Sequence, residues 1–131
     1  MRLKCIVIMV LILIGASIFV SCTGKHYDIP EDLIGKWTTT EPRYEDRFFE
    51  ITKETLIYGL GGDKQDVYSI SSLEKNLVGN QLLYSINYKN KKGFKFTRSF
   101  YYESANGGVI RFKNQKNIKW MKKKDDAVKE N

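Results

Sequence analysis

The chain has 131 residues, with 22 lysines and arginines against 15 aspartates and glutamates, two cysteines and one histidine. This length fits one domain, and so few sulfur and imidazole groups leave no metal site built on cysteine or histidine. The positive charge favours attraction to an anionic lipid, glycan or polymer, and it also serves simple solubility.

The chain begins like an exported protein. Arg2 and Lys4 precede residues 5–20, which carry no charge, and this order is typical of a secretory signal. The uncharged run is shorter than the roughly 20 apolar residues of a membrane-spanning helix. An uncleaved membrane helix is the alternative, and both interpretations place the rest of the chain outside the cytoplasm.

The apolar run ends at a cysteine. Phe19, Val20 and Ser21 directly precede Cys22, and this order resembles the bacterial lipobox, with Phe19 in place of the usual leucine. The resemblance implies removal of residues 1–21 and a diacylglyceryl group and N-acyl chain on Cys22. Several acyl chains hold a protein on a bilayer, because each buried CH₂ adds about 0.8 kcal/mol. The resemblance therefore implies a lipid-anchored protein of the bacterial cell envelope, and Thr23 points to the outer membrane where one exists.

The rest of the chain divides by composition. Residues 22–32 are polar and contain one proline, which predicts a tether between membrane and domain. Residues 33–123 form the predicted domain, and residues 124–131 form a charged tail.

Eight segments rich in β-branched and aromatic residues follow the tether, separated by short turns with glycine or asparagine. They are residues 33–40, 47–52, 55–60, 65–73, 81–89, 94–104, 109–113 and 117–122. No segment shows helical periodicity, and connections this short predict antiparallel pairing of consecutive strands. The sequence therefore predicts an all-β fold, a single antiparallel eight-stranded meander that forms a closed or nearly closed barrel.

Alternation along these segments predicts which side chains point inward. The predicted inward set is Trp37, Phe49, Ile51, Leu82, Tyr84, Ile86, Tyr88, Phe94, Phe96, Arg98, Phe100, Tyr102, Ile110, Phe112, Ile118 and Trp120. Arg98 is the one charge in this set. A buried guanidinium is costly unless it is paired, so we expect Arg98 to stack on Trp37, meet a carbonyl or carboxylate, or reach water at a barrel mouth.

Gly35-Lys36-Trp37 opens the first of these strands and resembles the Gly-x-Trp signature of lipocalins. The resemblance implies a small lipocalin-like barrel in which Trp37 closes one end. It also implies that an arginine from a late strand, here Arg98, packs on that tryptophan.

Catalytic patterns are missing from the predicted domain. His26, the single histidine, falls in the tether, so no serine has a histidine base beside it. The glycine pairs at 61–62 and 107–108 fall in predicted hairpin turns and precede no helix, unlike a phosphate-binding loop. We predict a protein that is not an enzyme and holds no metal or cofactor beyond the lipid on Cys22.

Two binding functions remain. The barrel mouth would carry a small apolar or amphipathic ligand, with Tyr58, Tyr84, Tyr88, Arg98 and Tyr102 as polar contacts, unless these side chains fill a closed core. The outer face would act as an envelope interaction module for an anionic polymer, lipid or protein, but not nucleic acid. Its predicted basic patch is Lys89, Lys95, Arg111, Lys113 and Lys119, unless these form an ordinary solvated face. We favour the filled barrel and the interaction module, and a cavity of a few hundred Å³ would favour the carrier.

Overall fold

The computed structural model describes residues 27–124, so the predicted signal segment, Cys22, His26 and most of the tail lie outside the described residues. The strands are β1 (Gly35–Thr38), β2 (Arg47–Ile51), β3 (Thr55–Gly61), β4 (Lys64–Val78), β5 (Gln81–Lys89), β6 (Lys95–Glu103), β7 (Val109–Phe112) and β8 (Trp120–Lys122). Three single 3₁₀ turns complete the set: η1 (Glu31–Leu33), η2 (Pro42–Tyr44) and η3 (Ala105–Gly107). Within the described part, no helix is long and apolar enough to cross a membrane.

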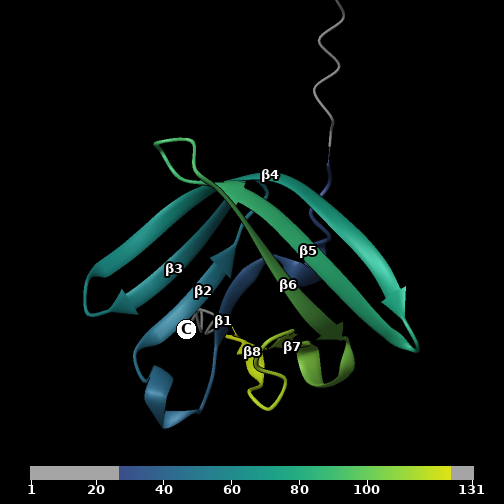
Figure 1. The fold of residues 1–131 in the computed structure, drawn as a ribbon. Helices are drawn as coiled ribbons and strands as arrows, with labels where there is room; N and C mark the ends of the chain where they lie inside the picture. Colours follow the sequence, from purple (N-terminus) through teal and green to yellow (C-terminus); the bar gives the residue numbers. More distant parts are fainter. Residues whose placement is uncertain (1–26, 125–131) are drawn as a thin grey trace, which may run out of the picture.

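The strands form a closed barrel (Figure 1). Each strand pairs antiparallel with the next along the chain, and β1 pairs with β8 through Trp37 opposite Lys122. The Lys123 N–H adds a hydrogen bond of 2.7 Å to the Lys36 carbonyl beside this seam. The predicted eight-stranded antiparallel meander is therefore confirmed, in its fully closed form.

Strand β4 extends past its predicted end, through Val78. Residues 74–78 are exposed on both faces, so they lack the alternation by which a strand is recognised. They pair with β5 up to Val78 opposite Gln81, across a two-residue turn in which Gly79 has a φ of 62°. A bulge between Ile70 and Ser72 increases the bend of β4 where it passes from β3 to β5.

Most of the predicted inward set is buried. The buried members are Trp37, Phe49, Ile51, Tyr84, Ile86, Tyr88, Phe100, Ile110, Phe112, Ile118 and Trp120. Leu82, Arg98 and Tyr102 are partly buried, whereas Phe94 and Phe96 have 63% and 42% of their surface exposed. The prediction that they are core residues was wrong because β7 pairs only with Phe100–Glu103, so the first half of β6 extends past the wall.

The segment before β1 belongs to the barrel. Ile29 and Leu33 are buried in the core, and the Tyr27 hydroxyl donates a hydrogen bond to the Ile70 carbonyl of β4. Packing against the barrel therefore includes Tyr27 and Ile29 of the predicted tether, and Ile29 and Leu33 cover one end of the barrel.

Candidate functional site

Trp37 lies at the barrel end that η1 covers, and its side chain is fully buried. The indole Nε1–H donates a hydrogen bond of 3.0 Å to the Leu33 carbonyl. The ring stacks on Phe49 at 6.1 Å between centroids and meets the Tyr102 ring edge-on at 6.4 Å. These contacts fill this end of the barrel, which we call the closed end.

The cation beside Trp37 is not the predicted one. Lys122 of β8 places its Nζ 5.4 Å from the centre of the indole. The guanidinium of Arg98 lies instead over the rings of Phe112 and Tyr58. The implied contact between Arg98 and Trp37 is therefore wrong, since the side chain of Arg98 turns toward the other end of the barrel.

Two of the five predicted ligand contacts belong to the closed end. Tyr84 stacks on Phe100 at 5.7 Å, and it meets Tyr102 at 6.2 Å in an edge-on contact. Burial raises the pKa of the Tyr102 phenol, and the nearby charge of Asp32 raises it further. Tyr84 and Tyr102 pack the closed end and line no part of the cavity described next.

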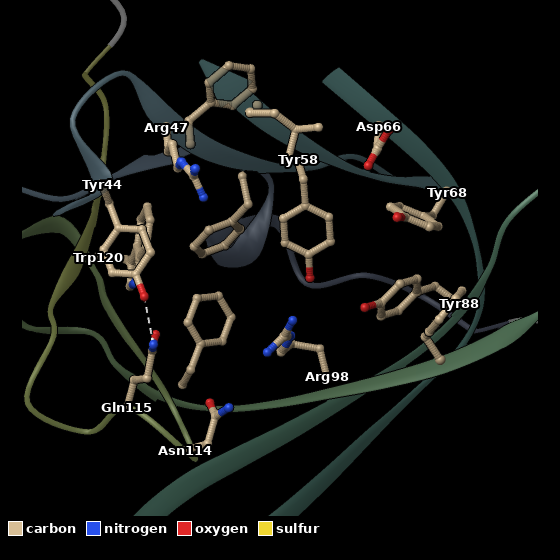
Figure 2. A pocket seen from close by; sticks show the side chains of 16 residues that line it. Tyr44, Arg47, Tyr58, Asp66, Tyr68, Tyr88, Arg98, Asn114, Gln115 and Trp120 are labelled. Carbon is tan, nitrogen blue, oxygen red and sulfur yellow. Dashed lines mark hydrogen bonds between the residues drawn. The ribbon is translucent and has the colours of Figure 1, made fainter. Parts of the chain in front are cut away.

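A cavity of about 470 Å³ occupies the opposite half of the barrel and opens to the surface. We call it the barrel pocket (Figure 2). Its lining residues come from η2, from each of the strands β2 to β8, and from the loop between β7 and β8. They are Tyr44, Arg47, Phe48, Phe49, Tyr58, Gly59, Leu60, Asp66, Tyr68, Tyr88, Phe96, Arg98, Phe112, Asn114, Gln115 and Trp120.

Arg98 reaches into the barrel pocket from β6. Its guanidinium carbon lies 5.3 Å from the centre of the Phe112 ring and 6.0 Å from that of Tyr58. Its Nε is buried and has no hydrogen-bond partner. Burial alone lowers the pKa of Arg98, but the hydroxyls of Tyr58 and Tyr88 reverse that effect and raise the pKa above its usual value. The pocket therefore contains a permanent positive charge.

Tyr58 and Tyr88 surround that charge, and Figure 2 shows their hydroxyls turned toward Arg98. The Tyr58 hydroxyl oxygen is buried without a hydrogen-bond partner. Burial raises the pKa of Tyr58 far above its ordinary value, Tyr88 adds to the effect, and Arg98 opposes it. Tyr68 packs edge-on against both tyrosine rings, at 5.8 Å from Tyr58 and 5.0 Å from Tyr88.

Trp120 forms the opposite wall of the pocket. Its ring packs against Phe49 and Phe112, at 5.3 and 5.9 Å between centroids, while its Nε1–H is buried without a partner. Beside it, where Tyr44 packs against Trp120, Gln115 Nε2 donates a hydrogen bond of 2.7 Å to the Tyr44 hydroxyl. This bond joins η2 to the loop before β8 and fixes one edge of the mouth.

Sequence reasoning thus found part of the pocket. Tyr58, Tyr88 and Arg98 are brought together as predicted, and Trp120 was placed inward but not identified as a polar contact. Tyr44 and Gln115 come from irregular segments, where no alternation reports the direction of a side chain.

The five residues of the predicted basic patch fall into two groups. Lys89 and Lys95 are opposite each other at one end of the β5–β6 pair. Lys113 donates its backbone N–H to the Ser99 carbonyl at 3.0 Å, and Arg111 lies opposite Tyr101. Thr97 and Ser99 lie on β6 between Lys95 and this second group. Arg111 is also ion-paired with Glu103. Polar uncharged side chains therefore separate two smaller basic groups.

The second basic group borders a shallow groove on the outer wall. The groove encloses about 320 Å³ and is lined by Gln81, Tyr101, Arg111, Lys116, Asn117 and Lys119. Lys116 Nζ lies 5.1 Å from the centre of the Tyr101 ring.

Among residues 27–124, no group of three or more histidine, cysteine, aspartate or glutamate side chains is placed to hold a metal ion. The chain matches no protein-family model, no curated protein and no solved structure. The argument for function therefore starts from the barrel pocket.

Proposed function

We propose that the barrel binds a small amphipathic ligand with an oxygen-rich anionic group, and that the protein carries this ligand at a membrane. The observation that carries the proposal is that three residues lining one cavity each hold a buried polar atom without a hydrogen-bond partner: Tyr58 Oη, Arg98 Nε and Trp120 Nε1. Buried polar groups are nearly always hydrogen-bonded, because an unsatisfied one costs about 1–3 kcal/mol. A ligand that accepts hydrogen bonds removes this cost.

The chemistry of these atoms defines the ligand class. Arginine and tryptophan side chains only donate hydrogen bonds, and a tyrosine hydroxyl can donate as well. The ligand must therefore supply acceptors, and the charge of Arg98 favours a carboxylate or phosphate. The rings of Phe49, Phe112 and Trp120 pack together in another part of the wall and suit an apolar body.

The size of the cavity fits this class. Small-molecule sites enclose roughly 300–1,000 Å³ and combine apolar walls with a few polar groups. A volume of about 470 Å³ lies in this range, so the pocket holds one ligand of moderate size. This volume favours the carrier over the filled barrel that we expected from the sequence.

The substitution Arg98→Met tests the proposal, because it keeps the bulk of the side chain and removes its charge and donors. We expect a folded variant that no longer releases a fluorescent probe when a fatty acid is added, whereas the parent releases it. Thermal melting of the same sample shows that the barrel is intact. An Arg98→Met protein that binds fatty acid like the parent would contradict the proposal.

Arg111→Met is the matched control for this experiment. It removes the same charge from the outer wall, where Arg111 pairs with Glu103, and it leaves the barrel pocket untouched. We expect binding by the control to equal binding by the parent. Equal losses in both variants would mean that net charge, rather than the pocket, determines binding.

We further propose that Cys22 carries the lipid that holds this carrier in the bacterial cell envelope. The support is the order Phe19-Val20-Ser21-Cys22 after an uncharged run. Cys22→Ser is expected to abolish signal cleavage and membrane retention, and globomycin is expected to leave the parent precursor uncut. Normal processing of the Ser variant, followed on a gel of membrane and soluble fractions, would rule out the lipid.

The outer groove supports a second candidate, the envelope interaction module. Arg111, Lys116 and Lys119 place three cations around one shallow site, which suits an anionic polymer or protein segment. The double substitution Lys116→Glu and Lys119→Glu is expected to abolish retention on an anionic polysaccharide column at low salt. Unchanged retention would make these lysines an ordinary solvated surface.

A further inference from the structure

The hairpin between β5 and β6 ends in a loop that is closed by its own hydrogen bonds. The Asn90 N–H donates to the Phe94 carbonyl at 3.1 Å, and the Gly93 N–H donates to the Asn90 carbonyl at 3.0 Å. The Asn90 side-chain oxygen accepts from the N–H groups of Lys92 and Phe94, both at 3.0 Å. The loop therefore presents its side chains in a defined arrangement before any partner binds.

This hairpin tip combines exposed aromatic rings with lysines. Phe94 and Phe96 are 63% and 42% exposed, although phenylalanine is usually buried. Four exposed lysines surround them: Lys89, Lys91, Lys92 and Lys95. The sequence has no aspartate or glutamate between residues 75 and 102, so no acid offsets these charges along the hairpin. Aromatic rings with flanking lysines are the composition of segments that lie in the interface of an anionic bilayer.

The β4–β5 hairpin tip is also apolar and exposed, and it differs from the β5–β6 tip in its charged residues. The β4–β5 tip exposes Leu77 and Val78, at 70% and 47%, but its nearest charges are Glu74 and Lys75, which cancel. Exposed apolar surface alone would fit any apolar partner, whereas the added lysines of the β5–β6 tip select a negatively charged one.

The tip also lies near the point where the described chain begins. The Tyr27 hydroxyl binds the carbonyl of Ile70, which is opposite Tyr88 at the base of the hairpin, and the neighbouring Ser69 is opposite Lys89. Figure 1 shows the first described residues and the β5–β6 loop at the same, upper end of the barrel. Cys22 precedes Tyr27 by only five residues, which span at most about 17 Å. This step rests on the membrane attachment proposed above, and it brings the hairpin tip within reach of the bilayer.

We propose that residues 89–96 dock on the surface of an anionic lipid bilayer. Phe94 enters the boundary between headgroups and acyl chains, and the lysines bind the lipid phosphates. Phe96 belongs both to this tip and to the wall of the barrel pocket. Docking therefore turns one edge of the pocket mouth toward the lipid surface.

Site-specific fluorescence on the full chain tests this surface. Lys92→Cys places a label on the β5–β6 tip and keeps Phe94, while Asn80→Cys places the same label on the β4–β5 tip. Each protein is labelled with an environment-sensitive dye and reconstituted into vesicles of phosphatidylcholine with or without phosphatidylglycerol. The mature lipidated chain without an added cysteine supplies the background, because removal of residues 1–21 and acylation of Cys22 leave it no free thiol.

On anionic vesicles we expect a blue shift at residue 92 and quenching by headgroup nitroxides, with neither effect at residue 80. Phe94→Ser in the Lys92→Cys chain, or removal of the anionic lipid, is expected to abolish most of the blue shift. Equal spectra at residues 92 and 80 would overturn the proposal, as would a shift that does not depend on anionic lipid. Sedimentation of the same vesicles separates docking of the hairpin from membrane attachment through Cys22. A chain that sediments with the vesicles but carries an unshifted label at residue 92 overturns docking alone.

Discussion

The two ends of this barrel are built from the same residue types, but side chains fill one end and a cavity occupies the other. At the closed end, Trp37 donates to the Leu33 carbonyl and packs between Phe49 and Tyr102, so that its polar atom is satisfied and its ring is fully buried. In the barrel pocket, Trp120 is packed almost as well but its Nε1–H has no partner. Aromatic content therefore does not distinguish a core from a site, whereas unsatisfied polar atoms around a cavity do.

The difference comes from what covers each end. The closed end receives η1 and the apolar side chains of Ile29 and Leu33, which add both volume and a carbonyl acceptor. The pocket end receives η2 and the loop before β8, which meet through the Gln115–Tyr44 hydrogen bond at the rim and line the cavity without filling it. The short segment that covers one end thus leaves a cavity at the other end.

The largest effect is expected from removing the Trp37 side chain at the closed end. Trp37→Ala should lower the free energy of unfolding by about 3–5 kcal/mol, because it deletes a fully buried ring. In a domain of this size that lowers Tm by at least about 10 °C, measured by thermal melting. A loss below about 1 kcal/mol would mean that this end is not the stable half of the barrel.

A smaller effect is expected from crowding the closed end at Gly108, whose φ is 105°. A Cβ there would lie 3.1 Å from Trp37 Cη2 and 3.3 Å from Tyr102 Cε2. Gly107→Ala is the matched control, because its φ of 82° is similarly strained but no atom lies within 4 Å of the added Cβ. We expect Gly108→Ala to destabilise by about 1–3 kcal/mol more than the control. Equal midpoints of urea unfolding would show that the closed end has space for an added methyl group beside Trp37 and Tyr102.

The pocket end should respond to Tyr58→Phe in binding rather than in stability. Removing a buried hydroxyl without a partner should change the free energy of unfolding by about 1 kcal/mol or less. Loss of a hydrogen bond to a charged ligand group, about 1.5–3 kcal/mol, should weaken fatty-acid binding roughly 10- to 100-fold. Tyr84→Phe at the closed end serves as control, and equal binding losses in both variants would erase the distinction between the ends.

The smallest effect concerns pH. Tyr58 titrates near 10.0 in the unfolded chain, and burial raises its pKa in the folded barrel. The folded state therefore keeps the proton that the unfolded state loses, so this contribution to stability is complete below pH 10 and is lost as the pH rises above it. Urea unfolding at pH 9 and 11 should show a steeper decline for the parent than for Tyr58→Phe. Parallel declines would mean that Tyr58 is not desolvated in the pocket.

Much of the architecture was predictable because short turns and alternation are local signals. The barrel, the inward face of β5 and the meeting of Tyr58, Tyr88 and Arg98 all follow from them. Alternation does not report how far a wall extends, so Phe94 and Phe96 were assigned to a core that ends before them.

The remaining errors concern contacts between distant segments. The sequence pattern does not say which ring a guanidinium will reach, and the contact with Trp37 that the lipocalin resemblance implied is replaced by contacts of Arg98 with Phe112 and Tyr58. The volume left inside the barrel depends on how the segment before β1 and the loop before β8 pack, and neither has a regular period.

The seam between β1 and β8 sets the order in which this barrel assembles. Seven of the eight strand pairings join neighbours along the chain, whereas the pairing of Trp37 with Lys122 joins the first strand to the last. Closing so long a segment costs more entropy than closing a hairpin, so we expect the seam to form last during folding and to separate first during unfolding. Since Trp120 belongs to both β8 and the pocket wall, the first opening of the fold also widens the cavity.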